Sequence, residues 1–234
     1  MASDTDHAIL IVGASRGLGH AMAEEFVARG WNIIGTVRGN ARTPLHDLAE
    51  RHPDAVRVET LDITDAEHIA ALRTRLADQR LDMLFVNAGT TTHDPMAQVG
   101  AVSPEEFTQV MLTNALSPLR VIEALQDRVP ADGLIGAMSS GQGSLADNVK
   151  GSREVYRASK AALNMLMKSF AAREAAAPRA MVLLAPGWIK TDLGGPDAPY
   201  TMEESVPKLV DVLIEKRGRP GLEYLDRFGG TVSW

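Results

Sequence analysis

The segment ILIVGASRGLG, residues 9–19, joins a short apolar run to a turn that contains three glycines. Residues 20–29 then place apolar side chains at helical spacing, and Gly30 is a natural helix stop. Residues 31–37 form a second apolar run, which is typical of a strand. A strand, a glycine turn, a helix and a second strand together predict one βαβ unit of a parallel sheet.

The same alternation continues along the rest of the chain. Further short apolar runs predict strands over residues 56–61, 83–86, 133–138, 179–185 and 222–226. Capping boxes at 64–67 and 103–106 open helices expected to reach about residues 79 and 127, and Pro118 can bend the second. A long helix is expected over 154–176. We therefore expect one α/β domain over residues 1–234, with a doubly wound, mainly parallel, seven-stranded sheet and helices on both faces.

Composition narrows the class of function. The chain of 234 residues is 45% hydrophobic and 23% charged, which is ordinary for a globular protein. The net charge of −6 argues against nucleic acid as the main partner, because phosphate binding needs a basic face. The chain has no cysteine, and the spacing of its 6 histidines suits no metal site. The first residues lack a signal-peptide pattern and no apolar run suits a membrane span, so we expect a cytoplasmic protein.

Gly13, Gly17 and Gly19 lie in the turn between the first strand and the first helix. Glycines there let the backbone approach the pyrophosphate of a dinucleotide, which then lies at a helix N-terminus. The spacing G-x-x-x-G-x-G differs from the usual G-x-G-x-x-G, so a simple strand-to-helix turn is the alternative. The position between a strand and a helix favours cofactor binding.

The end of the second strand, Gly35-Thr-Val-Arg38, indicates which cofactor binds. An acidic residue here would accept the ribose hydroxyls of NAD, whereas an arginine pairs with the 2′-phosphate of NADP. Arg38 occupies this position, and the glycine turn adds Arg16. We therefore expect NADP(H) in preference to NAD(H). A solvated arginine at a strand end is the alternative.

The segment Tyr156-Arg-Ala-Ser-Lys160 carries the predicted acid–base pair. Residues four apart share a helix face. A lysine ammonium beside a phenol favours the phenolate and lowers a pKa that starts near 10, so the tyrosine can exchange a proton at working pH. The alternative is a partly buried tyrosine beside a surface lysine.

The chain resembles the short-chain dehydrogenase/reductase family over nearly its whole length. The resemblance rests on an ordered set of motifs: Gly13-x-x-x-Gly17-x-Gly19, Asp62, Asn87-Ala-Gly89, Asn114, Ser140, Tyr156-x-x-x-Lys160 and Pro186-Gly187. Residues 143–147 and 225–234 resemble in addition the bacterial C-factor subgroup. The resemblance implies a Rossmann-type NAD(P)-binding domain, and a homodimer or homotetramer.

The resemblance also implies the roles of the catalytic residues. Tyr156 would be the general acid in reduction and the general base in oxidation, and Lys160 would lower its pKa and bind the nicotinamide ribose. Ser140, rather than Ser139, would hydrogen-bond the substrate carbonyl. Asn114 would hold a water in a proton relay to Lys160. Simple loop serines and a structural mid-helix asparagine are the alternatives.

The cofactor contacts follow from the same resemblance. Asp62 and Ile63 would flank the adenine, and residues after the sixth strand would hold the nicotinamide end. The predicted set is Gly13, Ser15, Arg16, Gly17, Leu18, Gly19, Arg38, Asp62, Ile63, Asn87, Ala88, Gly89, Tyr156, Lys160, Pro186, Gly187, Ile189 and Thr191. Asp62 and Asn87 could instead serve local backbone groups, and Thr191 could cap a turn.

Three features depart from the family pattern. Val12 replaces a usual threonine and Val86 replaces one of two usual asparagines, which removes polar contacts between neighbouring strand ends. Ser140 and Tyr156 are 16 residues apart, which is wider than usual. We expect substrate loops at about 141–155 and 187–206, because such loops shape the pocket.

The combined prediction is an NADP(H)-dependent oxidoreductase that interconverts a carbonyl and an alcohol in a small molecule. It needs no metal, nucleic acid or membrane. One alternative is a module that senses NADP(H) without turnover, against which the acid–base pair argues. Another is a dehydratase or epimerase on the same fold, but the compact chain leaves little room for a larger C-terminal substrate region.

Overall fold

The computed structural model of the chain describes residues 7–176 and 179–234. Its centre is a seven-stranded sheet with the order β3-β2-β1-β4-β5-β6-β7, in which every neighbouring pair of strands is parallel. The strands are β1 (Ala8–Val12), β2 (Asn32–Val37), β3 (Val56–Thr60), β4 (Met83–Val86), β5 (Leu134–Met138), β6 (Ala180–Ala185) and β7 (Gly221–Asp226). The predicted fold class is confirmed, and this sheet is parallel throughout.

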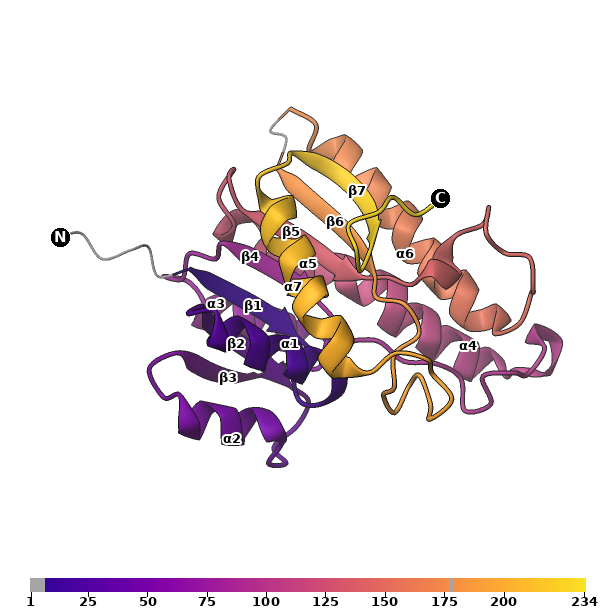
Figure 1. Cartoon of the computed structure of the whole chain (residues 1–234), viewed down its shortest axis with the longest axis horizontal. Helices are drawn as coiled ribbons and strands as arrows, with labels where there is room; N and C mark the ends of the chain where they lie inside the picture. The colour runs from indigo at the N-terminus through magenta and orange to yellow at the C-terminus, as the bar shows by residue number, and fades with distance from the viewer. Residues whose placement is uncertain (1–6, 177–178) are drawn as a thin grey trace.

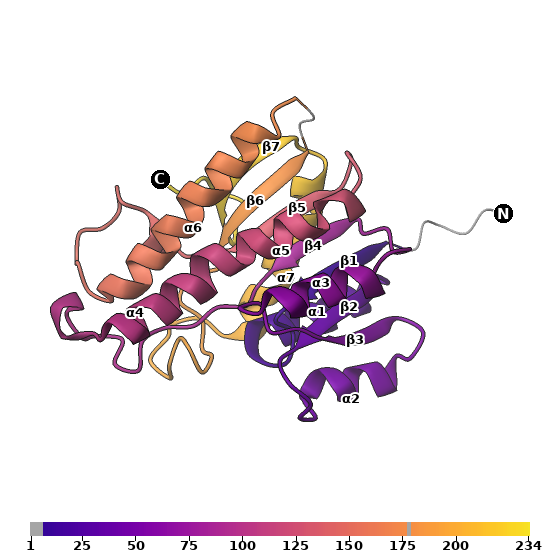
Figure 2. The same ribbon diagram turned by 180° about the vertical axis from the view of Figure 1, so that it is seen from behind.

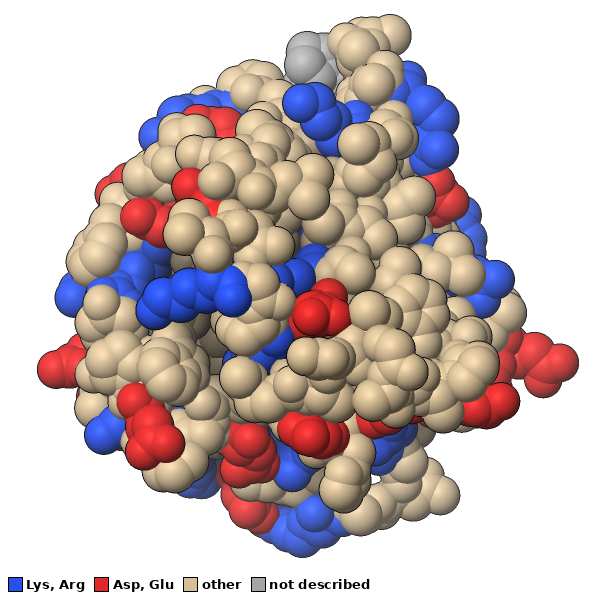
Figure 3. All heavy atoms as spheres, turned by 90° about the vertical axis from the view of Figure 1, so that its right-hand side faces the viewer, with Lys and Arg blue, Asp and Glu red and all other residues tan. Residues whose placement is uncertain are grey.

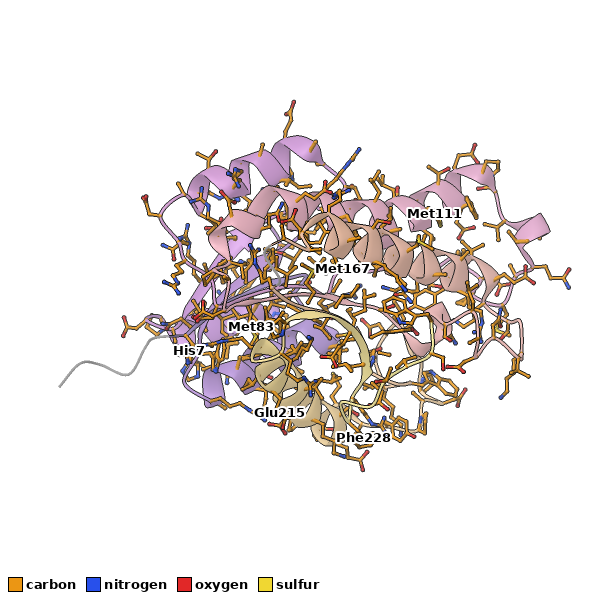
Figure 4. The ribbon with its side chains drawn as sticks, turned by 90° about the horizontal axis from the view of Figure 1, so that it is seen from above. His7, Met83, Met111, Met167, Glu215 and Phe228 are labelled. Atoms are coloured by element: carbon orange, nitrogen blue, oxygen red, sulfur yellow. The ribbon has the colours of Figure 1, made fainter. Side chains whose placement is uncertain are left out.

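Two layers of helices cover the sheet. α1 (Gly17–Ala28), α2 (Pro44–Arg51) and α7 (Met202–Arg217) lie over one face (Figure 1). α3 (Ala66–Arg75), α4 (Pro104–Met111), α5 (Ser117–Leu125) and α6 (Glu154–Arg173) lie over the other (Figure 2). Alternate residues of β1 enter the two cores, Ile9 on the α1 side and Leu10 on the α6 side. Figure 4 shows Met167 of α6 between that helix and the sheet, where it is fully buried.

The predicted helices differ from the observed ones mainly at their first residues, and two helices, α2 and α7, were not predicted. α7 begins at Met202, inside the segment 187–206 expected as a substrate loop, and Thr201 and Glu204 form the capping box that opens it. α1 begins at Gly17, inside the glycine turn, rather than at His20. Asp65, and not Thr64, is the N-cap of α3, because its carboxylate accepts hydrogen bonds from the N–H groups of the first turn. The eight residues of α2 bury only two side chains, too few for a helical period to stand out. None of the helices in the described residues combines the length and apolar character that crossing a membrane requires.

The helix predicted after Ser103 is one rod with a local change of winding. A π-helical turn, Leu112–Leu116, lies between α4 and α5. Pro118 has no N–H and so cannot donate to the carbonyl four residues earlier, that of Asn114. Single π-turns inside helices occur frequently at functional sites. Here the turn holds Asn114, whose side chain is fully buried.

The carboxyl ends of the strands lie at one edge of the sheet, on the right in Figure 1. Strand order reverses between β1 and β4, and doubly wound sheets bind their ligands outside the carboxyl ends at such a point. Figure 3 looks onto this edge. The surface there is hollowed, and Lys and Arg side chains lie around the hollow. The loops after the strands therefore define where a site is to be sought.

Candidate active site

The turn after β1 has the form of an anion site. Gly13 has φ +88°, and a Cβ added to it would lie 2.8 Å from the backbone of Ala88. A Cβ added at Gly19 would lie 2.1 Å from the Gly13 carbonyl oxygen, so neither position accepts a side chain. α1 begins here without a side-chain cap from the described residues and without an acidic residue in its first turn. Its first N–H groups are thus suited to an anion.

Neighbouring strand ends support this turn. Thr36 Oγ1 accepts a hydrogen bond from Gly13 N at 2.9 Å, and Asn87 Nδ2 donates to the Gly13 carbonyl at 2.8 Å. Val12 and Val86 pair in register across β1 and β4 and are buried in the core. Thr36 and Asn87 therefore supply the polar support, and the two valines add apolar packing. The other predicted residues of these turns are Ser15, Gly17, Leu18, Ala88 and Gly89.

Arg38 and Asp62 lie close together beyond β2 and β3. Burial raises the pKa of Asp62, but hydrogen bonds from Thr64 and the charge of Arg38 hold it below its usual value. Asp62 Oδ1 accepts from the Thr64 backbone N–H at 2.9 Å and from its hydroxyl at 2.7 Å, so this carboxylate serves the turn. The Ile63 side chain is buried in the core. Arg38 is exposed and forms no hydrogen bond or ion pair within residues 7–176 and 179–234.

Arg16 in the glycine turn contacts the loop after β6. Its Nη1 donates to Asp192 Oδ2 at 2.9 Å, and the two side chains are 74% and 79% exposed. Exposed ion pairs contribute about 0–1 kcal/mol, so a ligand phosphate can displace this one at little cost.

Tyr156, Ser140 and Lys160 meet at the carboxyl end of β5. The Tyr156 hydroxyl lies near the side chain of Ser140, whose Oγ accepts from Gln142 N at 3.2 Å. Lys160 lies one turn further along α6, and its Nζ donates to the Met138 carbonyl at 2.9 Å. Tyr156 is 8% exposed and Lys160 3%. The helix thus presents a buried phenol and a buried amine to the same strand end.

Ser139 faces a different set of groups. Its Oγ donates to Asn164 Oδ1 at 2.6 Å, and both side chains are buried. The Tyr224 hydroxyl donates to the Ser140 carbonyl. These contacts fix the end of β5 against α6 and β7, and it is Ser140 that the structure brings to Tyr156.

The charges around the phenol differ from the sequence-based expectation. Burial raises the pKa of Tyr156, while the charge of Arg153 and the nearby Ser140 side chain act to lower it. Burial also lowers the pKa of Lys160, to about 8. Lys160, the predicted cation, has its Nζ 5.7 Å from the centre of the Tyr156 ring, and Arg153, which was not predicted, has its Cζ nearer, at 4.9 Å. The predicted lowering of the Tyr156 pKa is not observed, because burial outweighs the nearby charge. The motif Tyr156-x-x-x-Lys160 begins after Arg153, so it gives no indication of a role for this arginine.

Asn114 connects the π-turn to the segment after β4. Its Oδ1 accepts from Thr90 N at 2.8 Å, and its Nδ2 donates to the Thr90 carbonyl at 2.8 Å and to Ser159 Oγ at 2.9 Å. A Cβ added at Gly89 would lie 3.3 Å from Asn114 Oδ1 and 3.5 Å from Lys160 Nζ. The amide and the amine therefore converge on one place.

Asn114→Ala is expected to lower the free energy of unfolding by about 2 kcal/mol, because the partly buried backbone N–H and carbonyl of Thr90 lose their partner and Ser159 Oγ keeps only its bond to the Tyr156 carbonyl. Denaturant unfolding measures this loss. Thr113→Ala, in the same π-turn but partly exposed, is the matched control and should change stability by less than about 0.5 kcal/mol. Equal losses in the two variants would contradict the role assigned to the amide.

The loop after β6 begins with Pro186 and Gly187. Gly187 has φ +86°, and a Cβ added to it would lie 2.9 Å from Arg227 Nη1. The Ile189 side chain is buried in the core. Thr191 Oγ1 accepts from Gly194 N at 2.9 Å and so caps a turn within the loop. A side chain at Gly187 would therefore require Arg227 to move.

Comparison with known proteins identifies the family. A sequence profile of the short chain dehydrogenase family matches residues 7–199. The chain belongs to this family. Within it, 1-hydroxy-2-glutathionyl-2-methyl-3-butene dehydrogenase from a Rhodococcus species is 32% identical over 188 residues, which are 79% of this chain and 79% of that protein. The C-signal protein of Myxococcus xanthus is 33% identical over 166 residues, 70% of this chain and 99% of that one. The resemblance to the C-factor subgroup is thereby confirmed.

Two solved structures extend the comparison within the short-chain dehydrogenases. A Burkholderia multivorans protein assigned to this family, solved with bound NADP, is 63% identical with a TM-score of 0.97, covering 98% of this chain and 100% of its own. A carbonyl reductase from Pseudomonas aeruginosa in complex with NADP is 35% identical with a TM-score of 0.88, covering 98% and 100%.

Proposed function

We propose that this short-chain dehydrogenase is an NADP(H)-dependent oxidoreductase that interconverts a carbonyl and an alcohol. The observation that carries the proposal is the meeting of Tyr156, Ser140 and Lys160 in a buried site at the carboxyl edge of the sheet. The two NADP-bound relatives support the choice of cofactor.

The residues of the chain fit a dinucleotide phosphate. The backbone at Gly13 and Gly19 excludes side chains, and the start of α1 offers N–H groups to a pyrophosphate. Arg38 would hold the 2′-phosphate, assisted by Arg16 once it leaves Asp192. Gly187 would border the nicotinamide end. When bound, the cofactor supplies or accepts the hydride.

The proton is moved by the chain's own groups. In reduction the Tyr156 hydroxyl gives its proton to the substrate oxygen, and in oxidation the phenolate takes it back. Ser140 Oγ holds the same oxygen. After reduction Tyr156 must regain its proton. Asn114 would hold a water and Lys160 the nicotinamide ribose, and the proton would return through them, since the polar atoms of both side chains converge beside Gly89. Burial raises the pKa of Tyr156 and keeps the phenol protonated at neutral pH, as an acid in reduction requires.

The test of this function is consumption of NADPH with a panel of aldehydes and ketones. Turnover above the rate without enzyme supports the proposal. If NADPH binds but no carbonyl is reduced and no alcohol is oxidised by NADP⁺, the protein would be a sensor of the cofactor instead.

Arg38→Asp is expected to weaken NADPH binding by about 100-fold and leave NADH binding unchanged or tighter, because it replaces the cation with a charge that repels the 2′-phosphate. Calorimetric titration of both cofactors measures the ratio. Arg42→Gln is the control, since Arg42 follows β2 as well but is already paired with Asp47 and Glu50. An unchanged ratio in Arg38→Asp, or equally tight binding of NADH by the unaltered protein, would refute the NADP preference.

A further inference from the structure

Arg153 holds an unusual position at the first turn of α6. It is the N-cap of the helix, with φ 60° and ψ 44°, and is the one non-glycine residue among 7–176 and 179–234 with a left-handed backbone. This conformation directs its guanidinium over the catalytic phenol, with Cζ 4.9 Å from the centre of the Tyr156 ring. Glycine would adopt this left-handed conformation without strain. An arginine that adopts it therefore indicates a functional role for its side chain.

The Arg153 side chain also has few polar contacts with the described residues. Its Nε and Nη2 are buried without a hydrogen-bond partner, and it forms no ion pair within the described residues. Its side chain makes no cap hydrogen bond, and a cation at a helix N-terminus opposes the helix dipole. Arg157, one turn along the same helix, donates instead to the Ser152 carbonyl at 2.6 Å. Apart from the contact with the Tyr156 ring, Arg153 contributes little to the fold.

The surroundings of Arg153 favour an anion. The chain carries a net charge of −6, yet Lys and Arg gather around the hollow at the carboxyl edge (Figure 3). Arg16 and Arg38 belong to the loops that would hold the cofactor phosphates. Arg153 lies instead over the phenol that faces the substrate oxygen; its side chain is half-buried, and its unpartnered Nε and Nη2 are shielded from solvent. A guanidinium with free N–H groups matches the planar, bidentate geometry of a carboxylate.

We infer that Arg153 binds a carboxylate of the substrate, so that the preferred substrates are oxo acids whose carboxylate lies on the carbon next to the reacting carbonyl or one carbon further away. The inference rests on the proposed function and names its substrate class. In reduction the 2-oxo or 3-oxo acid would become the hydroxy acid, with the hydride added to carbon and the Tyr156 proton to oxygen. The carboxylate would supply the missing acceptors for the guanidinium.

The experiment compares each oxo acid with its methyl ester, which has the same reacting carbonyl but no charge. At saturating NADPH, kcat/KM of the unaltered enzyme should favour the acid. Arg153→Gly removes the charge beside Tyr156 for both substrates. It should lower kcat/KM for the acid by about 10- to 100-fold more than for the ester, because only the acid also loses a charged hydrogen bond. Arg173→Gln is the matched control. It removes one arginine charge at the far, exposed end of the same helix, where Arg173 pairs with Glu123.

A second measurement separates a functional from a structural arginine. Glycine accepts the left-handed backbone without strain, so Arg153→Gly should unfold at the same temperature as the unaltered protein or higher. A preference for the ester, or equal losses on acid and ester in Arg153→Gly, would overturn the inference. So would a lower unfolding temperature, which would mark Arg153 as a structural residue.

Failure of the proposed function gives a different result. In that case neither acids nor esters are reduced, and the inference is judged by binding alone. Oxamate, an unreactive mimic of a 2-oxo acid, is titrated into the complex with NADPH. Binding by the unaltered protein and by Arg173→Gln, with loss of at least about 10-fold in affinity in Arg153→Gly, supports the carboxylate site. Absence of binding, or equal binding by all three proteins, refutes it.

Discussion

Tyr156→Phe is expected to lower kcat by about 10³-fold while the affinity for NADPH stays unchanged. The substitution removes one oxygen, the proton donor, and leaves the buried ring in place beneath Arg153. In the proposed function the cofactor phosphates are held by the glycine turn and Arg38, which the substitution leaves unchanged. Steady-state turnover and titration with NADPH measure the two quantities separately.

Tyr224→Phe is the matched control for this experiment. It removes the same atom from a buried tyrosine whose hydroxyl donates to the Ser140 carbonyl rather than reaching its side chain. We expect a loss in kcat of less than about 10-fold, because the proton donor stays in place. Turnover in Tyr156→Phe close to that of Tyr224→Phe would refute the mechanism. In the unaltered enzyme, reduction should fall as the pH rises through the pKa of Tyr156, and burial places that fall on the alkaline side.

The architecture of the sheet could be predicted because its signal is local. The inner strands are short, mostly apolar runs buried on both faces, as parallel strands between helices must be, and the edge strands β3 and β7 are partly exposed. The side-chain cap on α4 follows from the short motif that begins at Ser103. α2 was missed because a helix of eight residues shows too little of the helical period. The π-turn was not predicted because it depends on the tertiary contacts of Asn114. The sequence indicates only a bend at Pro118.

The candidate site could be predicted only where a motif covers it. Tyr156, Lys160 and Ser140 come together as the family resemblance implied. The polar support of the glycine turn by Thr36 could not be predicted, because strand neighbours are fixed by topology and register. Arg153 had no signal at all, since arginine is an uncommon choice for a left-handed N-cap. Residues that break local preferences in this way are the ones most closely tied to function.

Lys160→Met is expected to abolish most turnover and yet stabilise the protein near neutral pH. Burial lowers the pKa of Lys160 from 10.5 to about 8, which corresponds to a cost of about 3 kcal/mol for keeping the amine charged in the folded protein. Methionine fills a similar volume without that cost, but the Met138 carbonyl loses its contact with Nζ. The expected net gain in the free energy of unfolding is about 1–2 kcal/mol at pH 7. Turnover should fall by about 100-fold or more.

The difference in stability between Lys160→Met and the unaltered protein should depend on pH. Below pH 8 the lysine is protonated in both states, and the folded protein bears the full cost of burying the charge. Between about pH 8 and 10.5 the unfolded chain binds more protons than the folded one, so the stability of the unaltered protein rises with pH. The advantage of Lys160→Met should therefore be largest below pH 8 and shrink towards pH 10.5. Denaturant unfolding of both proteins across this range measures it. A variant that is less stable at pH 7, or a difference independent of pH, would mean that Lys160 is not a strained buried amine held in place for catalysis.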